Sequence, residues 1–124
     1  MPQKPLILVV DDDEPILTLM RSLLREFGFE TLTAKSGQAA LEIAQRDAPS
    51  LALVDRHMPG MNGDDLVRAL RALPSDGRLP ILILSGDPVS SAQLAALDAD
   101  GAVLKPFDVS ALIAQIRGHL DGKA

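Results

Sequence analysis

Short runs of apolar residues alternate along the chain with longer stretches in which apolar residues recur at helical spacing. A strand that is covered on both faces needs no polar positions, so a short continuous apolar run predicts a buried strand. Four such runs span residues 6–10, 51–54, 81–84 and 102–104. A fifth segment, 30–34, mixes polar and apolar residues, as a strand at the edge of a sheet would.

The stretches between these runs predict five amphipathic helices, because their apolar residues lie three and four positions apart. The stripes fall within residues 16–27, 39–44, 66–73, 94–97 and 109–120. Pro15 suits the first turn of the first helix, and Gly28 is a stop signal after it. Ser36 and Asp108 are the expected caps of the second and fifth helices. Pro74 should end the third.

Alternation of strand and helix five times over predicts an α/β fold with an open parallel sheet and helices on both of its faces. The short run 102–104 and the mixed segment 30–34 make natural edges. This arrangement suits a doubly wound, flavodoxin-like sheet of five strands in the order 2-1-3-4-5. The 124 residues fall in the size range of one domain, so residues 1–124 are expected to form a single one.

Composition narrows the class of protein. The core must be aliphatic, because the chain has three Phe and no Trp or Tyr, and no Cys is present for disulfides or thiolate metal sites. A net charge of −5 argues against direct nucleic-acid binding, which needs a basic surface. No apolar run approaches the length of a membrane span or of a secretion signal. A cytoplasmic protein without membrane contact is expected.

Polar residues that could take part in catalysis or bind a ligand directly follow four of the predicted strands. Asp11 and Asp12 follow the strand at 6–10, and Asp55 follows the strand at 51–54. Ser85 follows the strand at 81–84, and Lys105 follows the strand at 102–104. In a doubly wound sheet, ligands bind beyond the carboxyl ends of the strands, at the switch point between strands 1 and 3. The predicted fold therefore gathers three carboxylates, a hydroxyl and an ammonium at one edge.

The run of four acids at residues 11–14 is more than helix capping needs. Asp13 is the expected cap, and one further acid would favour the helix dipole. The remaining carboxylates would repel one another unless a cation lay between them. Mg²⁺ takes oxygen ligands, usually one or two carboxylates together with water and a substrate phosphate. Asp11 and Asp12 are therefore candidate ligands of a divalent metal ion.

Asp55 is a candidate nucleophile. It is followed at 56–63 by a Pro- and Gly-rich turn, as a functional loop after a strand would be. A carboxylate can attack phosphorus and hold it as an aspartyl-phosphate, provided that the charge on the phosphoryl oxygens is neutralised. Lys105 can supply a fixed positive charge, and the Ser85 hydroxyl can donate to a phosphoryl oxygen. Each signal is weak alone, but together and in order they are strong.

The residues at these strand ends resemble those of the receiver domains of two-component response regulators, the CheY-like family. The resemblance covers essentially the whole chain and is carried by the stretches ILVVDDDEP, LALVDRHMPGMNG, PILILSG and AVLKPF. It implies a phosphorylation switch in a phosphorelay, a signalling domain rather than an enzyme with an external substrate. The implied partners are a histidine kinase or phosphotransfer protein and a downstream effector or fused output domain.

The resemblance also implies a role for each matching residue. Asp55 would be the phosphoacceptor and a metal ligand. Asp12 would bind Mg²⁺ directly and Asp11 through water, with the backbone carbonyl of His57 completing the protein ligands.

Two more roles concern the switch itself. Ser85 would be the switch hydroxyl. Lys105 would pair with the phosphoryl group, and its peptide bond to Pro106 would be cis. One position departs from the family pattern: Ala102 stands three residues before the lysine, where receivers usually carry Tyr or Phe. This departure leaves phosphoryl transfer intact and puts the usual output coupling in question.

Two alternatives remain at this stage. The Asp11-x-Asp13 pair also resembles haloacid-dehalogenase phosphatases, but Pro15 stands where those enzymes carry Thr or Val, and no later acidic strand end follows. A phosphate on Asp11 rather than Asp55 would identify that class. The second alternative is a receiver-like interaction module that takes no phosphate, which Mg²⁺ titration would distinguish.

Overall fold

Five strands alternate with five helices along residues 4–58, 60–74 and 78–121, the part of the chain that the computed structural model describes. The strands form one parallel sheet in the predicted order, β2-β1-β3-β4-β5. In chain order the elements are β1 (Leu6–Val10), α1 (Glu14–Glu26), β2 (Glu30–Ala34), α2 (Gly37–Asp47), β3 (Leu51–Asp55), α3 (Gly63–Ala72), β4 (Ile81–Ser85), α4 (Ser91–Leu97), β5 (Gly101–Leu104) and α5 (Val109–Asp121).

Three strands are one residue longer than the apolar runs predict. β3 ends at Asp55 and β4 ends at Ser85, while β5 begins at Gly101. The apolar pattern stops short because the last residues of β3 and β4 are polar, yet both residues are buried and still pair with a neighbouring strand. Two of the candidate functional side chains are therefore parts of the rigid sheet rather than of loops.

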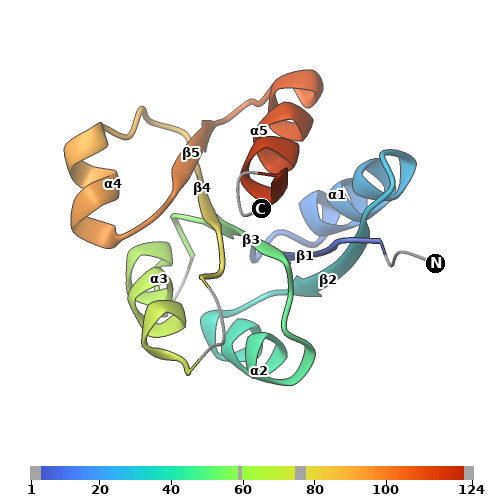
Figure 1. The fold of residues 1–124 in the computed structure, drawn as a ribbon. Coiled ribbons are helices and arrows are strands. Elements are labelled where there is room, and N and C mark those ends of the chain that lie inside the picture. The colour runs from blue at the N-terminus through green and yellow to red at the C-terminus, as the bar shows by residue number, and fades with distance from the viewer. Residues whose placement is uncertain (1–3, 59, 75–77, 122–124) are drawn as a thin grey trace.

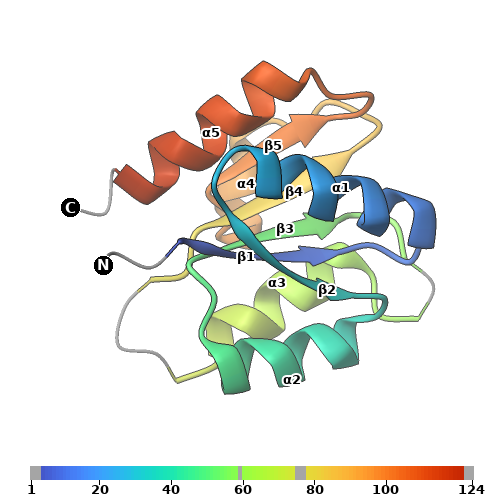
Figure 2. The same ribbon diagram turned by 90° about the vertical axis from the view of Figure 1, so that its right-hand side faces the viewer.

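The sheet separates two layers of helices. Ile7 and Val9 of β1 pack into a cluster with apolar residues of α1 and α5, whereas Leu8 and Val10 pack into a second cluster with residues of α2, α3 and α4. Successive side chains of a strand point to opposite faces, so one continuous apolar run fills both clusters. Figure 1 shows the sheet between the helices, and Figure 2 shows α1 and α5 above it with α2 and α3 below.

Two of the three predicted helix caps are confirmed. Ser36 accepts a hydrogen bond from the backbone of Ala39 at 3.2 Å, and Asp108 accepts one from the backbone of Ala111 at 3.0 Å. The prediction for Asp13 was wrong in part: it occupies the cap position of α1, but its side chain accepts no capping hydrogen bond. Its backbone N–H instead donates to a carboxylate oxygen of Asp11 at 3.0 Å, which ties the start of α1 to the strand end.

An ion-pair network with no signature in the sequence pattern joins the end of α3 to the segments before β4 and β5, at the amino-terminal edge of the sheet. Asp100 bridges Arg71 of α3 at 2.7 Å and Arg78 at 3.2 Å, and it accepts the backbone N–H of Ile81 at 2.8 Å. Burial by itself raises the pKa of Asp100, but the hydrogen bond from Ile81 and the two arginines outweigh it, so the pKa lies below 3.8. The network stabilises the connection into β4.

Asp100→Asn is expected to lower the free energy of unfolding by about 1–3 kcal/mol at neutral pH, because hydrogen bonds to a charged group are lost. Folding lowers the pKa of this carboxyl, so its contribution is complete above 3.8 and disappears as the pH falls through the lower folded value. Urea unfolding of both proteins at pH 7 and near pH 3 measures this. Equal stability at pH 7 would contradict the prediction.

Candidate functional site

Parallel pairing brings the acidic strand ends together. Val10 of β1 pairs with Val54 of β3, so the next residues, Asp11 after β1 and Asp55 at the end of β3, lie side by side at the edge of the sheet. Carboxylate oxygens of Asp11, Asp12 and Asp55 all lie within 4.8 Å of one another. The three carboxylates that the sequence predicts to meet at one edge therefore do meet, at the switch point between β1 and β3.

Lys105 reaches this group from the end of β5. Its Nζ donates to Oδ1 of Asp55 at 3.1 Å and lies 3.5 Å from Oδ2 of Asp11. Burial alone would lower the pKa of Lys105, but the hydrogen bond and charge of Asp55, followed by the charge of Asp11, raise it above 10.5. The ammonium therefore stays charged across the physiological pH range and neutralises part of the cluster.

One positive charge does not satisfy the three acids. Asp11 is 1% exposed, and its Oδ2 is a buried atom with no hydrogen-bond partner among the described residues. Burial, chiefly, raises the pKa of Asp11, and the charges of Asp55 and Asp12 add to that, against the Asp13 hydrogen bond and Lys105. A buried oxygen without a partner is costly unless something satisfies it. The oxygen donors and the excess negative charge fit a hard divalent cation such as Mg²⁺.

Ser85 lies at the same edge but its hydroxyl is engaged elsewhere. The residue is 1% exposed at the end of β4. Its Oγ donates to the backbone carbonyl of Asp87 at 2.8 Å and accepts the backbone N–H of Asp87 at 3.1 Å. A hydroxyl that donates to a phosphoryl group on Asp55 would have to give up its hydrogen bond to the Asp87 carbonyl, so the loop after β4 is coupled to the hydroxyl.

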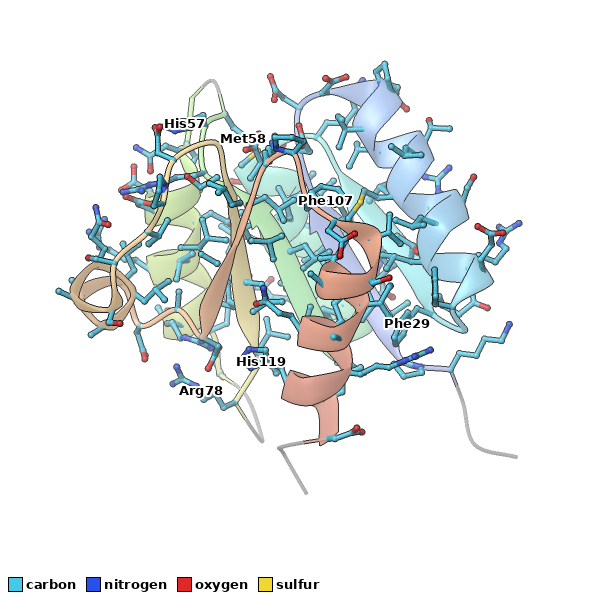
Figure 3. All side chains as sticks on the ribbon, turned by 90° about the horizontal axis from the view of Figure 1, so that it is seen from above. Phe29, His57, Met58, Arg78, Phe107 and His119 are labelled. Atoms are coloured by element: carbon cyan, nitrogen blue, oxygen red, sulfur yellow. The ribbon has the colours of Figure 1, made fainter. Side chains whose placement is uncertain are left out.

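The loop after β3 carries His57 close to the acids through its backbone. The backbone N–H of His57 donates to Oδ1 of Asp55 at 3.4 Å, while its side chain is exposed. Figure 3 shows His57 and Met58 at the opposite end of the molecule from Arg78 and His119. Pro59, part of the matched sequence stretch, lies outside the described residues.

Two features near Lys105 bear on the family resemblance: the peptide bond to Pro106 and the small residue at position 102. The Lys105–Pro106 peptide bond is cis, as the resemblance implies. Ala102 is half-buried against the cluster shared with α3 and α4, and its carbonyl accepts a hydrogen bond from the Gln115 amide at 3.4 Å. Position 102 thus contributes a methyl group and a backbone contact to α5, and no ring.

Three residues next to the site have no distinctive functional pattern in the sequence: Arg56, Gly63 and Asp64. Gly63 begins α3, and its backbone N–H donates to the carbonyl of Arg56 at 3.0 Å. Arg56 and Asp64 form a half-buried ion pair at 3.3 Å. The available signal was the Asn62-Gly63 pair before an apolar stripe, which is typical of a capped helix start. The Arg56–Asp64 pairing itself depends on how the loop folds back and has no local signature.

Comparison with known proteins identifies the group of proteins that shares this arrangement. Residues 7–117 match the sequence profile of the response regulator receiver domain. The chain belongs to the response regulator receiver domain family. This receiver domain therefore serves phosphorylation-dependent signalling in two-component systems and has the family's flavodoxin-like fold. The family consists of signalling domains that in general bind Mg²⁺, and the acidic cluster is compatible with such binding.

Relatives of known sequence include two mycobacterial regulators. DNA-binding response regulator MtrA of Mycolicibacterium smegmatis is 38% identical over 116 residues, which are 92% of this chain and 50% of that protein. Transcriptional regulatory protein PrrA of Mycobacterium tuberculosis is 36% identical over 118 residues, 94% of this chain and 50% of that protein. The receiver chain thus spans about half the length of these relatives.

Solved structures show the same fold. Chemotaxis response regulator CheY4 of Vibrio cholerae superposes with a TM-score of 0.87 at 28% identity, covering 94% of this receiver and 99% of that chain. A CheY-like receiver domain from Methanospirillum hungatei gives a TM-score of 0.88 at 26% identity, covering 98% and 97%. Among the described residues, no helix of the receiver is long and apolar enough to span a bilayer.

Proposed function

We propose that residues 1–124 form one receiver domain that accepts a phosphoryl group on Asp55, with Mg²⁺, from a histidine kinase or a phosphotransfer protein. One observation carries the proposal: the carboxylate of Asp55 lies at a strand end, close to two further carboxylates and hydrogen-bonded to the ammonium of Lys105. A nucleophile, a fixed cation and oxygen donors for a metal are what phosphoryl transfer requires.

The metal would be held by the side chains of Asp11, Asp12 and Asp55 and by the backbone carbonyl of His57. The buried Oδ2 of Asp11, which accepts no hydrogen bond among the described residues and has the Lys105 ammonium 3.5 Å away, and the crowding of three acids support this set. Mg²⁺, when bound, supplies positive charge that offsets the negative charge on the phosphoryl oxygens. Asp12 is exposed, which suits a ligand that also meets solvent and the incoming phosphoryl group.

The transfer itself is a substitution at phosphorus. A carboxylate oxygen of Asp55 forms a new O–P bond, and the bond from phosphorus to the donor nitrogen of a phosphohistidine, or to the donor oxygen of acetyl phosphate, breaks. Lys105 exchanges its hydrogen bond to Asp55 for one to the phosphoryl group. The Ser85 hydroxyl leaves the Asp87 turn and donates to a phosphoryl oxygen. The chain thereby catalyses its own phosphorylation and, with water as the nucleophile, its dephosphorylation.

The output of the whole protein is also a proposal. The relatives' names describe DNA-binding and transcriptional regulators, and this chain matches about half their length. We infer that the receiver acts on a protein effector or on a fused output domain, in the cytoplasm, without touching nucleic acid or membrane itself. The net charge of −5 supports the absence of direct nucleic-acid binding, since nucleic acid attracts basic surfaces.

Mapping the phosphoryl group tests the proposal. The protein is incubated with acetyl phosphate, with either Mg²⁺ or EDTA, and the labelled residue is located by borohydride reduction and mass spectrometry. The expected result is label on Asp55 in the Mg²⁺ sample alone. Label on Asp11 would support the phosphatase class instead, and absence of label at saturating donor and metal would support a module that only binds partners.

Lys105→Arg is expected to retain Mg²⁺ binding within about twofold but to lose most of the structural response to phosphorylation. The variant keeps the positive charge, yet the planar guanidinium has a different reach and shape from the compact ammonium, so the exchange is not conservative here. Amide chemical shifts with and without beryllofluoride, a phosphoryl mimic, measure the response. Equal shift changes in parent and variant would contradict this role of Lys105.

A further inference from the structure

Arg56 and Asp64 form an ion pair next to the proposed metal site, and neither residue is one of the proposed metal ligands. Nε of Arg56 is 3.3 Å from Oδ1 of Asp64, and Nη2 donates to Oδ2 at 3.5 Å. The two side chains are only 21% and 27% exposed. Oδ1 of Asp64 accepts no hydrogen bond among the described residues, so the contact is an ion pair with one long hydrogen bond. Its half-buried place restricts the two side chains more than solvent restricts an exposed pair.

The backbone of Arg56 is held from two more directions. Its N–H donates to the carbonyl of Leu84 in β4, and its carbonyl accepts the N–H of Gly63, both at 3.0 Å. Gly63 sits so close that a Cβ there would lie 2.5 Å from the carbonyl oxygen of Asp55 and 2.6 Å from Cα of Arg56. Backbone atoms cannot give way as a side chain can. The start of α3 is therefore seated directly against residues 55 and 56.

Arg56 stands between two residues that the proposed function places on the metal, one at the end of β3 and one in the loop after it. Asp55 precedes it and would contribute its side chain, and His57 follows it and would contribute its backbone carbonyl. A shift of Arg56 moves both. Asn62 strengthens the arrangement, because its side chain accepts the backbone N–H of Asp65 at 2.9 Å and so holds the first turn of α3.

We propose that the Arg56–Asp64 pair is a positioning clamp, which locks the start of α3 onto the β3 strand end and holds the Asp55 carboxylate and the His57 carbonyl ready for Mg²⁺. The proposal rests on the proposed function, because it assumes that these groups bind the metal. Without the pair, the loop keeps its backbone contacts and the packing of Met58 and Met61, but the Arg56 side chain no longer ties it to the first turn of α3, and binding has to order that part first. Ordering on binding weakens affinity.

The sign of one substitution separates this proposal from simple electrostatics. Arg56 is a positive charge near a cation site, so its removal should tighten Mg²⁺ binding if only the charge matters. If Arg56 positions the ligands, its removal should weaken binding. Arg56→Met keeps an unbranched apolar stem and loses the charge and the hydrogen bond, which makes it the decisive variant.

A second ion pair in α3, which includes the residue after Asp64, serves as a matched control. Arg68 and Asp65 of α3 are joined at 3.2 Å, but their side chains are 62% and 56% exposed. Arg68→Met and Asp65→Asn change the charge as Arg56→Met and Asp64→Asn do, and they break an ion pair of the same kind. Neither control side chain is bonded to the loop after β3 in the described part of the chain.

The experiment is a Mg²⁺ titration of the four variants and the parent, followed by amide shifts in ¹⁵N-labelled protein, with urea unfolding of each to measure stability. We expect Arg56→Met and Asp64→Asn to raise the Mg²⁺ dissociation constant by roughly threefold or more, as loss of a residue that orients ligands does. Arg68→Met and Asp65→Asn should leave it unchanged. If the pair served stability alone, its loss would shift the urea midpoint of unfolding and leave the Mg²⁺ dissociation constant unchanged.

The outcomes are distinguishable. Equal or tighter Mg²⁺ binding by Arg56→Met, in a parent that binds the metal and is phosphorylated on Asp55, overturns the clamp and leaves the proposed function standing. An equal loss in Asp65→Asn and Asp64→Asn also overturns it, since charge would then account for the effect. If Mg²⁺ caused no saturable change in the amide shifts of the parent, both the proposed function and the clamp would be contradicted.

Discussion

Asp55→Asn is expected to reduce phosphoryl labelling by acetyl phosphate to background, a loss of at least about 100-fold, because it removes the nucleophile. The amide is close in shape to the carboxylate, so the fold should survive. It cannot form an aspartyl-phosphate, and it weakens the contact with Lys105, which then faces Asp11 alone. The measurement is the stoichiometry of incorporated phosphate by intact-protein mass spectrometry in the presence of Mg²⁺.

Asp13→Asn is the matched control for this prediction. Asp13 lies two residues from Asp11 and is exposed, and its side chain caps nothing. The same exchange of acid for amide there should leave labelling at the parent level. Full incorporation of phosphate in Asp55→Asn, with the fold intact by circular dichroism, would sink the assignment of the phosphoacceptor.

Removal of the metal is expected to have the second largest effect. EDTA should abolish labelling of the parent, and Asp12→Ala should weaken Mg²⁺ binding by more than about tenfold and bring labelling close to background. The carboxylate of Asp12 is an exposed member of the acidic cluster, so its loss should cost little stability. Loss of function and loss of fold can therefore be separated in this variant.

Glu14→Ala serves as its control. Glu14 is also exposed and acidic, but it is not one of the three clustered carboxylates, and its ion partner is Lys35 at 3.0 Å. The two variants change the net charge equally. Mg²⁺ affinity from amide shifts and labelling rates with and without EDTA should fall in Asp12→Ala and stay at the parent level in Glu14→Ala. Metal-independent labelling of the parent would contradict the prediction.

Much of the architecture could be predicted from the sequence. Apolar runs without polar positions specify strands buried on both faces, and alternation with amphipathic stretches leaves few ways to build a sheet. The polar segment Glu30–Ala34 and the short last strand suit the two edges of the doubly wound order 2-1-3-4-5, which is the order found. Because parallel strands end at one edge, the proximity of Asp11, Asp12 and Asp55 could be inferred before any distance was known.

Partner choice within the site could not be inferred in the same way. The sequence places Ser85 and Lys105 at the right edge, but it does not say that the hydroxyl is held by Asp87 while the ammonium already contacts Asp55. Asp13 has the residue type and position of a cap and yet caps nothing with its side chain. Each of these contacts is decided by a competition among several polar groups within reach, at differences of about 1 kcal/mol.

The sequence alone therefore determined the fold, the edge of the sheet that carries the chemistry and the residue types found there, since these follow from hydrophobic periodicity and chain order. Only the tertiary structure decided the ion pairs of Arg56 with Asp64 and of Asp100 with two arginines. Hydrophobic burial acts at every position of an element and leaves a periodic pattern in the sequence. A pairing between two side chains depends on the final positions of loops and helix ends, and it leaves no periodic pattern.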